Sequence, residues 1–287
     1  HACGHDGHTA CLLGAARVLT ELRAQLPGNL ILLFQPGEES GRGAKRVVET
    51  GGVHRSEYEE AYTLHAWPGI PVGHVASRPG AMTASNDSVF VELTGLSGHG
   101  ARPHLCKSPI VAGADLIGLL TALTDSPAQN GEHAVVSVGK FHSGFSCNII
   151  PDSALLEGTI RSVSESMRQH LHKRVRELVH AVCDQHDITY ELKLSRDCDS
   201  VLNDQELYNR FVRLARTLLG KGAIAQLPET SMGAEDFSYY LNPARGLMFR
   251  LGMGEDSPGL HNACFDFNDD ALPAGIAVLS AMALFAQ

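Results

Sequence analysis

The stretch LILLF at residues 30–34, followed by QPGEE at residues 35–39, carries the clearest fold signal of the chain. A short apolar run bounded by turn residues is typical of a strand buried on both faces of a mainly parallel sheet. The stretch therefore predicts a strand over 30–34, with Glu38 and Glu39 directly beyond its carboxyl end. Binding sites of open α/β sheets gather beyond that edge.

The flanking sequence extends this pattern into an α/β domain. Apolar residues at helical spacing predict a helix over 9–25, and a second helix is expected over 44–49. A further strand over 61–64 ends at His65. Near the other end of the chain the same texture returns, with a helix over 204–219, a strand over 247–251 and a helix over 270–285.

The middle of the chain has a different pattern, which predicts an inserted domain. The expected order is strand, helix, strand, strand, helix, strand, as in a ferredoxin-like fold, over 89–93, 109–123, 134–141, 154–163, 165–186 and 188–194. This assigns residues 84–193 to the inserted domain. Residues 1–83 and 194–287 would then form the first domain.

Composition limits the classes of function. The net charge of −9 argues against nucleic-acid binding, which needs a basic face, and no apolar run reaches the length of a membrane span. The seven cysteines are scattered and form no CxxC pair, so we expect no disulfide framework and a reducing, cytoplasmic location.

Four places in the sequence carry residues suited to metal chemistry. They are the pair Cys3 and His5, the pair Glu38-Glu39, His65 and His261. Thiolate, imidazole and carboxylate are ligands of zinc, manganese and related divalent ions. Five ligands are too many for one catalytic zinc with an open position, so the set predicts two ions. Of the two adjacent glutamates, one can bind metal while the other serves as a general base.

Taken together, the motifs resemble those of the M20 metallopeptidase family. The resemblance is strongest to its amidohydrolase branch of hippurate hydrolases, N-acyl-amino-acid deacylases and plant auxin-conjugate hydrolases. The matching motifs, in the family's order over essentially the whole chain, are HACGHDGHT at 1–9, QPGEES at 35–40, LHAWPGIPVG at 64–73, SGHGARPH at 97–104, NIIPD at 148–152, GTIRS at 158–162, GAEDFSYYL at 233–241 and LHNACFDFND at 260–269.

The resemblance implies metal-dependent hydrolysis of the amide bond of an N-acyl amino acid by a metal-activated water. It implies two divalent ions, Mn²⁺ or Zn²⁺ with Co²⁺ or Ni²⁺ as alternatives, and Glu38 as the general base. It also implies that residues 84–193 form a lid through which a homodimer assembles. The implied metal ligands are Cys3, His5, Glu39, His65 and His261, and the implied substrate contacts are His99, which polarises the carbonyl across the dimer, with Asn148 and Arg161 on the carboxylate.

One departure from the family concerns the start of the chain. Members carry an aspartate-containing strand and loop before the CGHD motif, and that segment is missing ahead of His1. We therefore expect the catalytic sheet to lack its early strands.

Other interpretations stay open at this stage. The chain could be a metallo-dipeptidase or carboxypeptidase, or a non-catalytic dimeric binding protein. Several polar residues also have structural explanations: His8 belongs to a helix start, Glu235 and Asp236 begin a helix, and His170, His172 and His180 are expected to lie in solvent.

Overall fold

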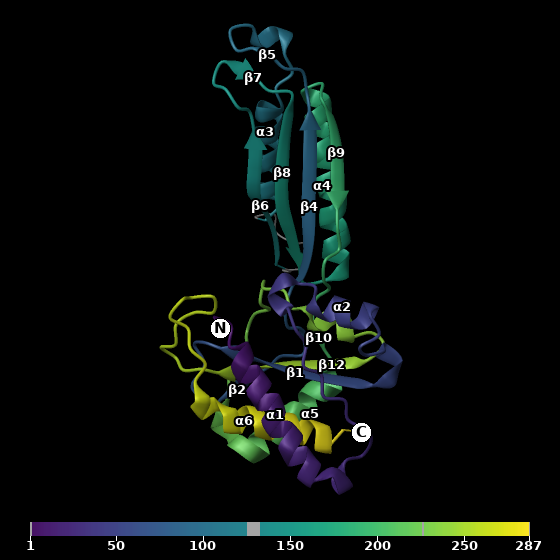
Figure 1. Ribbon diagram of the computed structural model, residues 1–287, viewed down its shortest axis with the longest axis vertical. Coiled ribbons are helices and arrows are strands. Elements are labelled where there is room, and N and C mark those ends of the chain that lie inside the picture. Colours follow the sequence, from purple (N-terminus) through teal and green to yellow (C-terminus); the bar gives the residue numbers. More distant parts are fainter. Residues whose placement is uncertain (1, 125–132, 226, 287) are drawn as a thin grey trace. The chain divides into compact units, whose positions relative to one another are not determined.

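The computed structural model describes residues 2–124, 133–225 and 227–286, and it divides the chain into two compact units. Unit 1 comprises residues 1–82, 201–230 and 236–287, and unit 2 comprises residues 83–200 and 231–235. Both helices and strands occur in each unit, so the fold is mixed α/β (Figure 1). None of the helices in the described ranges has the length and apolar character that crossing a membrane requires.

Unit 1 is built on a mixed sheet around strand β12 (Arg245–Gly252). Strand β1 (Glu60–Trp67) runs parallel to it along one edge. The short strands β10 (Leu202–Asn203) and β2 (Val75–Ala76) share the other edge, the first parallel and the second antiparallel. The remaining short strands, β3 (Gly80–Ala81) and β11 (Ile224–Ala225), pair with β10 and β2 respectively.

Three helices cover one face of this sheet and supply its core. They are α1 (His5–Glu21), α5 (Gln205–Leu219) and α6 (Leu272–Leu284) (Figure 1). Alternate strand residues such as Leu64 and Phe249 point into this layer, as the period of two requires. His65 and Arg250 are therefore directed to the opposite face, where α2 (Gly43–Glu49) and a smaller apolar cluster lie.

The predicted strand over residues 30–34 is wrong. These residues form no strand ladder, and Ile31 and Phe34 are 47% and 46% exposed. Within the described residues β1 pairs with β12 alone, so the apolar run pairs neither with β1 nor with any other strand of the sheet. The other predicted helices and strands are present with shifted ends.

Helix α1 packs so closely against the C-terminal part of the chain that one position in its first turn admits only glycine. A Cβ atom on Gly7 would lie 2.2 Å from the ring of Phe267, which is itself buried. We expect Gly7→Ala to lower the free energy of unfolding by about 1–3 kcal/mol, because the ring or the helix must shift. The measurement is denaturant-induced unfolding.

The matched control is Gly118→Ala, in helix α3 (Pro109–Ala122), where an added Cβ meets nothing within 4 Å. That change should be neutral or stabilise by up to about 1 kcal/mol, because alanine is the better helix former. Equal effects of the two changes would contradict the packing argument.

Unit 2 contains a four-stranded antiparallel sheet in the order β6-β8-β4-β9 (Figure 1). The strands are β4 (Ser85–Thr94), β6 (Ala134–Ser143), β8 (Ser153–Ser162) and β9 (Thr189–Leu194). Helices α3 and α4 (Glu165–Gln185) pack on one face around a single apolar cluster. A two-stranded ribbon of β5 (Gly98–His99) and β7 (Ile149–Ile150) completes the unit.

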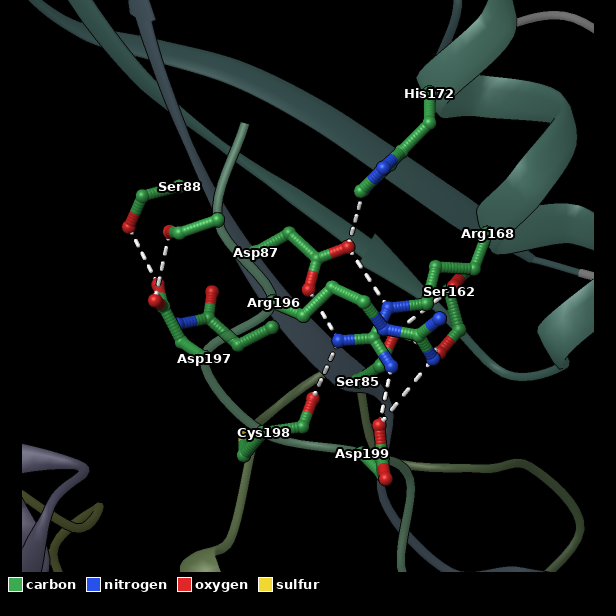
Figure 2. Close-up of polar contacts among 12 residues, drawn as sticks. Ser85, Asp87, Ser88, Ser162, Arg168, His172, Arg196, Asp197, Cys198 and Asp199 are labelled. Carbon is green, nitrogen blue, oxygen red and sulfur yellow. Dashed lines mark hydrogen bonds and ion pairs between the residues drawn. The ribbon is translucent and has the colours of Figure 1, made fainter. Parts of the chain in front are cut away.

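A buried charge network joins α4 to β4 and to the chain after β9 (Figure 2). Asp87 is fully buried and accepts hydrogen bonds from two nitrogens of the Arg168 guanidinium and from His172. Arg168 is 2% exposed and also donates to Asp199 and to the carbonyl of Cys198. The expectation that His172 lies in solvent is therefore wrong, whereas His170 and His180 are exposed.

Candidate metal centre

The first segment of the centre is shaped by Gly4, which separates Cys3 from the start of helix α1 at His5. Gly4 adopts a left-handed conformation with φ 77°, and a Cβ there would lie 3.1 Å from Phe267 and 3.2 Å from Ala66. Glycine is thus required by both conformation and space. The turn leaves Cys3 buried and His5 half-buried.

The other three donors come from separate parts of unit 1. Glu38 and Glu39 lie in a short 3₁₀ turn between two left-handed glycines. His65 lies within β1, which continues to Trp67 and so does not end at His65 as expected. His261 has φ 63°, and its N–H donates to the carbonyl of Ala2 at 2.7 Å, which fixes this loop beside the N-terminal segment.

These segments bring five donor side chains together. The Sγ of Cys3 lies 3.4 Å from Nε2 of His65 and 3.3 Å from Nε2 of His261. An Oε1 of Glu39 lies 3.4 Å from Nε2 of His261 and 3.6 Å from Nε2 of His5. Glu39 thus belongs to two groups of side chains, one with Cys3 and His261 and the other with His5 and Glu38. Within each group the possible ligand atoms lie within 4.8 Å of one another.

The protonation states suit metal binding. Burial lowers the pKa of His65 to about 4, so its imidazole is neutral at physiological pH. Its Nδ1–H donates to the carbonyl of Ala66 at 2.7 Å, which leaves the Nε2 lone pair directed to the centre. The donors, which are a thiol, three imidazoles and a carboxylate, are therefore a set that divalent ions of the zinc and manganese type accept.

Glu38 stands apart from this ligand set electrostatically. Burial, followed by the charges of Asp236 and Glu39, raises the pKa of Glu38 to about 7. Its Oε2 lies 3.9 Å from Nε2 of His5. A carboxylate whose pKa is near the working pH can both accept and return a proton.

Two polar residues around the centre have roles that the sequence did not indicate. His8 is more than a helix-start residue, because its Nε2 accepts the N–H of Ala66 at 2.8 Å and its ring lies 4.7 Å from that of His65. Asp236 begins a 3₁₀ turn as expected, and it is also buried and accepts hydrogen bonds from Gln35 and from the N–H of Ala44. The spacing of His5 and His8 by one helical turn is the sequence signal that could have indicated the role of His8.

The substrate-contacting residues implied for unit 2 fall into two places. His99 and Asn148 are exposed neighbours on the β5-β7 ribbon, where the N–H of Gly100 donates to the carbonyl of Asn148. Arg161 is at the far end of β8 and donates to Oδ1 of Asn86 at 3.0 Å. The β8 residues from Ser153 to Arg161 span on the order of 25 Å, so a single chain does not bring Asn148 and Arg161 together.

The fold and the donor set are those of a metal-dependent amide hydrolase, and comparison with known proteins identifies the family. The model of peptidase family M20/M25/M40 matches residues 1–284. The chain therefore belongs to this family of hydrolases.

Similar proteins agree with this assignment. The chain is 35% identical over 284 residues to "Probable hydrolase sll0100" of Synechocystis sp., covering 98% of this chain and 72% of that protein. It is 34% identical to IAA-amino acid hydrolase ILR1-like 2 of Arabidopsis thaliana, covering 99% of this chain and 65% of that one. The crystal structure of Bacillus subtilis YXEP, a dinuclear metal binding peptidase of family M20, has a TM-score of 0.84 at 29% identity, covering 99% of this chain and 72% of that structure.

Proposed function

We propose that the protein hydrolyses the amide bond of N-acyl amino acids, with Cys3, His5, Glu39, His65 and His261 holding two divalent ions. The observation that carries this proposal is the convergence of these five donors, with a partly buried glutamate, Glu38, directly beside them. The ions would supply an activated water and offset the charge that develops on the carbonyl oxygen. Relatives named as an IAA-amino acid hydrolase and an N-acetyldiaminopimelate deacetylase support this substrate class.

In the proposed reaction Glu38 performs the proton transfers. Its carboxylate accepts a proton from the attacking water, and it later returns that proton to the leaving amine. His65 and His8 keep fixed orientations, because both form hydrogen bonds with the backbone of Ala66. The Glu38 side chain is 25% exposed, and its partial burial is the largest cause of its raised pKa.

We further propose that unit 2 is a ferredoxin-like lid that forms a homodimer. The separation of Asn148 from Arg161 supports this, because a second protomer could bring its β5-β7 ribbon, with His99 and Asn148, to the Arg161 end of the first. Apolar side chains near this ribbon also support an interface, since Phe145 is 84% exposed and Leu105 is 59% exposed.

A second candidate is a carboxypeptidase, because the chain is also 32% identical to thermostable carboxypeptidase 2 of Saccharolobus solfataricus. Comparing kcat/KM for an N-acetyl amino acid with that for a free dipeptide separates the two. Preference for the dipeptide would replace the first proposal.

The direct test of the centre is metal content after purification without chelators. We expect about two ions per chain by elemental analysis, and about one or fewer in Cys3→Ala, which removes the thiolate that lies against both His65 and His261. Cys264→Ala, at an exposed cysteine of the His261 loop, is the control and should keep the full content. Unchanged metal content in Cys3→Ala would overturn the ligand assignment.

A further inference from the structure

Two arginines of unit 1, Arg250 and Arg78, have a buried Nε atom without a hydrogen-bond partner among the described residues. Arg250 of β12 is 7% exposed, and its Nε is buried without a hydrogen-bond partner. The Nε of Arg78 is likewise buried and unpartnered, and this side chain makes one long contact, 3.5 Å from Nη1 to the carbonyl of Pro228. Among the described residues, neither guanidinium forms an ion pair.

The other buried arginines of the chain are paired. Arg168 lies against Asp87, and Arg210 lies against Glu60, where both side chains are 7% exposed. Burying a guanidinium without a counter-charge costs considerable free energy. The lack of a partner at Arg250 is therefore specific to this place in the sheet, and it points to an anion that none of the described residues supplies.

Arg250 lies beside the metal centre. It is in register with His65 on the neighbouring parallel strand, so both side chains are on the same face of the sheet. The guanidinium carbon of Arg250 lies 3.6 Å over the ring centroid of Trp67, whose ring is 5.9 Å from that of His65. Stacking on one face of the guanidinium leaves its edge N–H groups free to donate.

Arg78 adds a second positive charge to the same place. It follows Ala76 by two residues, and Ala76 is the β2 partner of Arg250. Burial, and then the charge of Arg78, lower the pKa of Arg250 to about 10, so the cation persists at neutral pH while the two charges repel each other. An anion between them would relieve the repulsion and the missing hydrogen bonds together.

We propose that Arg250 and Arg78, with Trp67 as a stacking platform, form a subsite for a carboxylate on the acyl group of the substrate. The substrate class is then the half-amide of a dicarboxylic acid with an amino acid, such as an N-succinyl amino acid. The planar Arg250 fork matches a carboxylate through two parallel hydrogen bonds. This inference rests on the proposed function, because it places the second carboxylate relative to the bond that is cleaved.

The chain offers a direct optical test, because Trp67 is its single tryptophan. Titrating the metal-loaded protein with succinate or acetate, while following tryptophan fluorescence, reports on the subsite without any turnover. We expect succinate to bind at least about tenfold more tightly than acetate, and we expect Arg250→Met to remove that difference. Arg213→Met, at an exposed arginine of α5, makes the same change in charge and should keep the difference in affinity between succinate and acetate.

A kinetic measurement completes the test. In the wild-type protein kcat/KM for an N-succinyl amino acid should exceed that for its N-acetyl counterpart, and Arg250→Met should abolish the preference mainly through KM. If the protein hydrolyses N-acetyl substrates, but Arg250→Met changes neither succinate binding nor the preference for N-succinyl substrates, the inference is overturned and the proposed function stands. Arg250-dependent binding of succinate without hydrolysis of either substrate would overturn the proposed function and keep the anion subsite.

Discussion

Glu38→Gln should lower kcat by about 10²–10⁴-fold while the metal content stays that of the wild type. The amide keeps the size and position of the side chain but cannot accept a proton from water. Nearby divalent ions would stabilise the Glu38 carboxylate, so the wild-type residue would be ready to act as a base at neutral pH. The measurement combines steady-state kinetics with elemental analysis of the same preparation.

The adjacent glutamate provides the matched control for this prediction. Glu39 lies 3.4 Å from His261 and 3.6 Å from His5, so Glu39→Gln should lower metal content as well as activity. The two variants differ by one position but separate proton transfer from metal binding. A Glu38→Gln protein that turns over substrate at the wild-type rate would exclude this residue as the base.

Arg168→Met should lower the free energy of unfolding by about 3–5 kcal/mol. The change leaves Asp87 fully buried without the guanidinium that donates two of its hydrogen bonds, and it removes the link to Asp199 and Cys198 (Figure 2). Removing Arg168 thus leaves the Asp87 carboxylate buried without the guanidinium charge that offsets its desolvation. Chemical denaturation of the purified protein measures the effect.

Two further variants distinguish this cause from a general loss of arginine. Arg174→Met, on the same helix, breaks a surface pair with Glu177 and should change stability by no more than about 0.5 kcal/mol. The double variant Arg168→Met, Asp87→Leu should recover part of the loss, because no unpaired charge remains in the core. A double variant that is less stable than Arg168→Met alone would contradict the explanation.

The fold was predictable where local pattern and tertiary packing agree. The long helices follow apolar positions at a period of 3.6, and β4 alternates along its whole length between buried residues and residues that are partly or fully exposed. The run at residues 30–34 was misread because a strand needs a neighbour, and a pattern of apolar residues contains no information on which neighbour is present. An apolar run therefore formed a strand elsewhere in the chain but no strand at residues 30–34.

The candidate site was predictable as a set of residue types but not as a geometry. Motifs indicated Cys3, His5 and His261, yet the hydrogen bond from Ala66 to His8 depends on how α1 meets β1. Arg168 could have been placed in the core, because it continues the buried stripe of Leu171, Val175 and Val179 at helical spacing. The stacking of Arg250 on Trp67 joins residues from two strands, and no local signal predicts it.

Cys3 and His261, whose side chains lie in contact in the candidate centre, are 258 positions apart in the sequence. A ribosome adding 5–20 residues per second needs about 10–50 s to pass from one to the other, and it synthesises the whole of unit 2 in between. The last imidazole thus leaves the ribosome only after all of unit 2 has been synthesised. A chain that stops before residue 261 has an incomplete donor set, so a stably bound pair of ions would mark a molecule in which synthesis has passed His261 and the two distant segments have folded together.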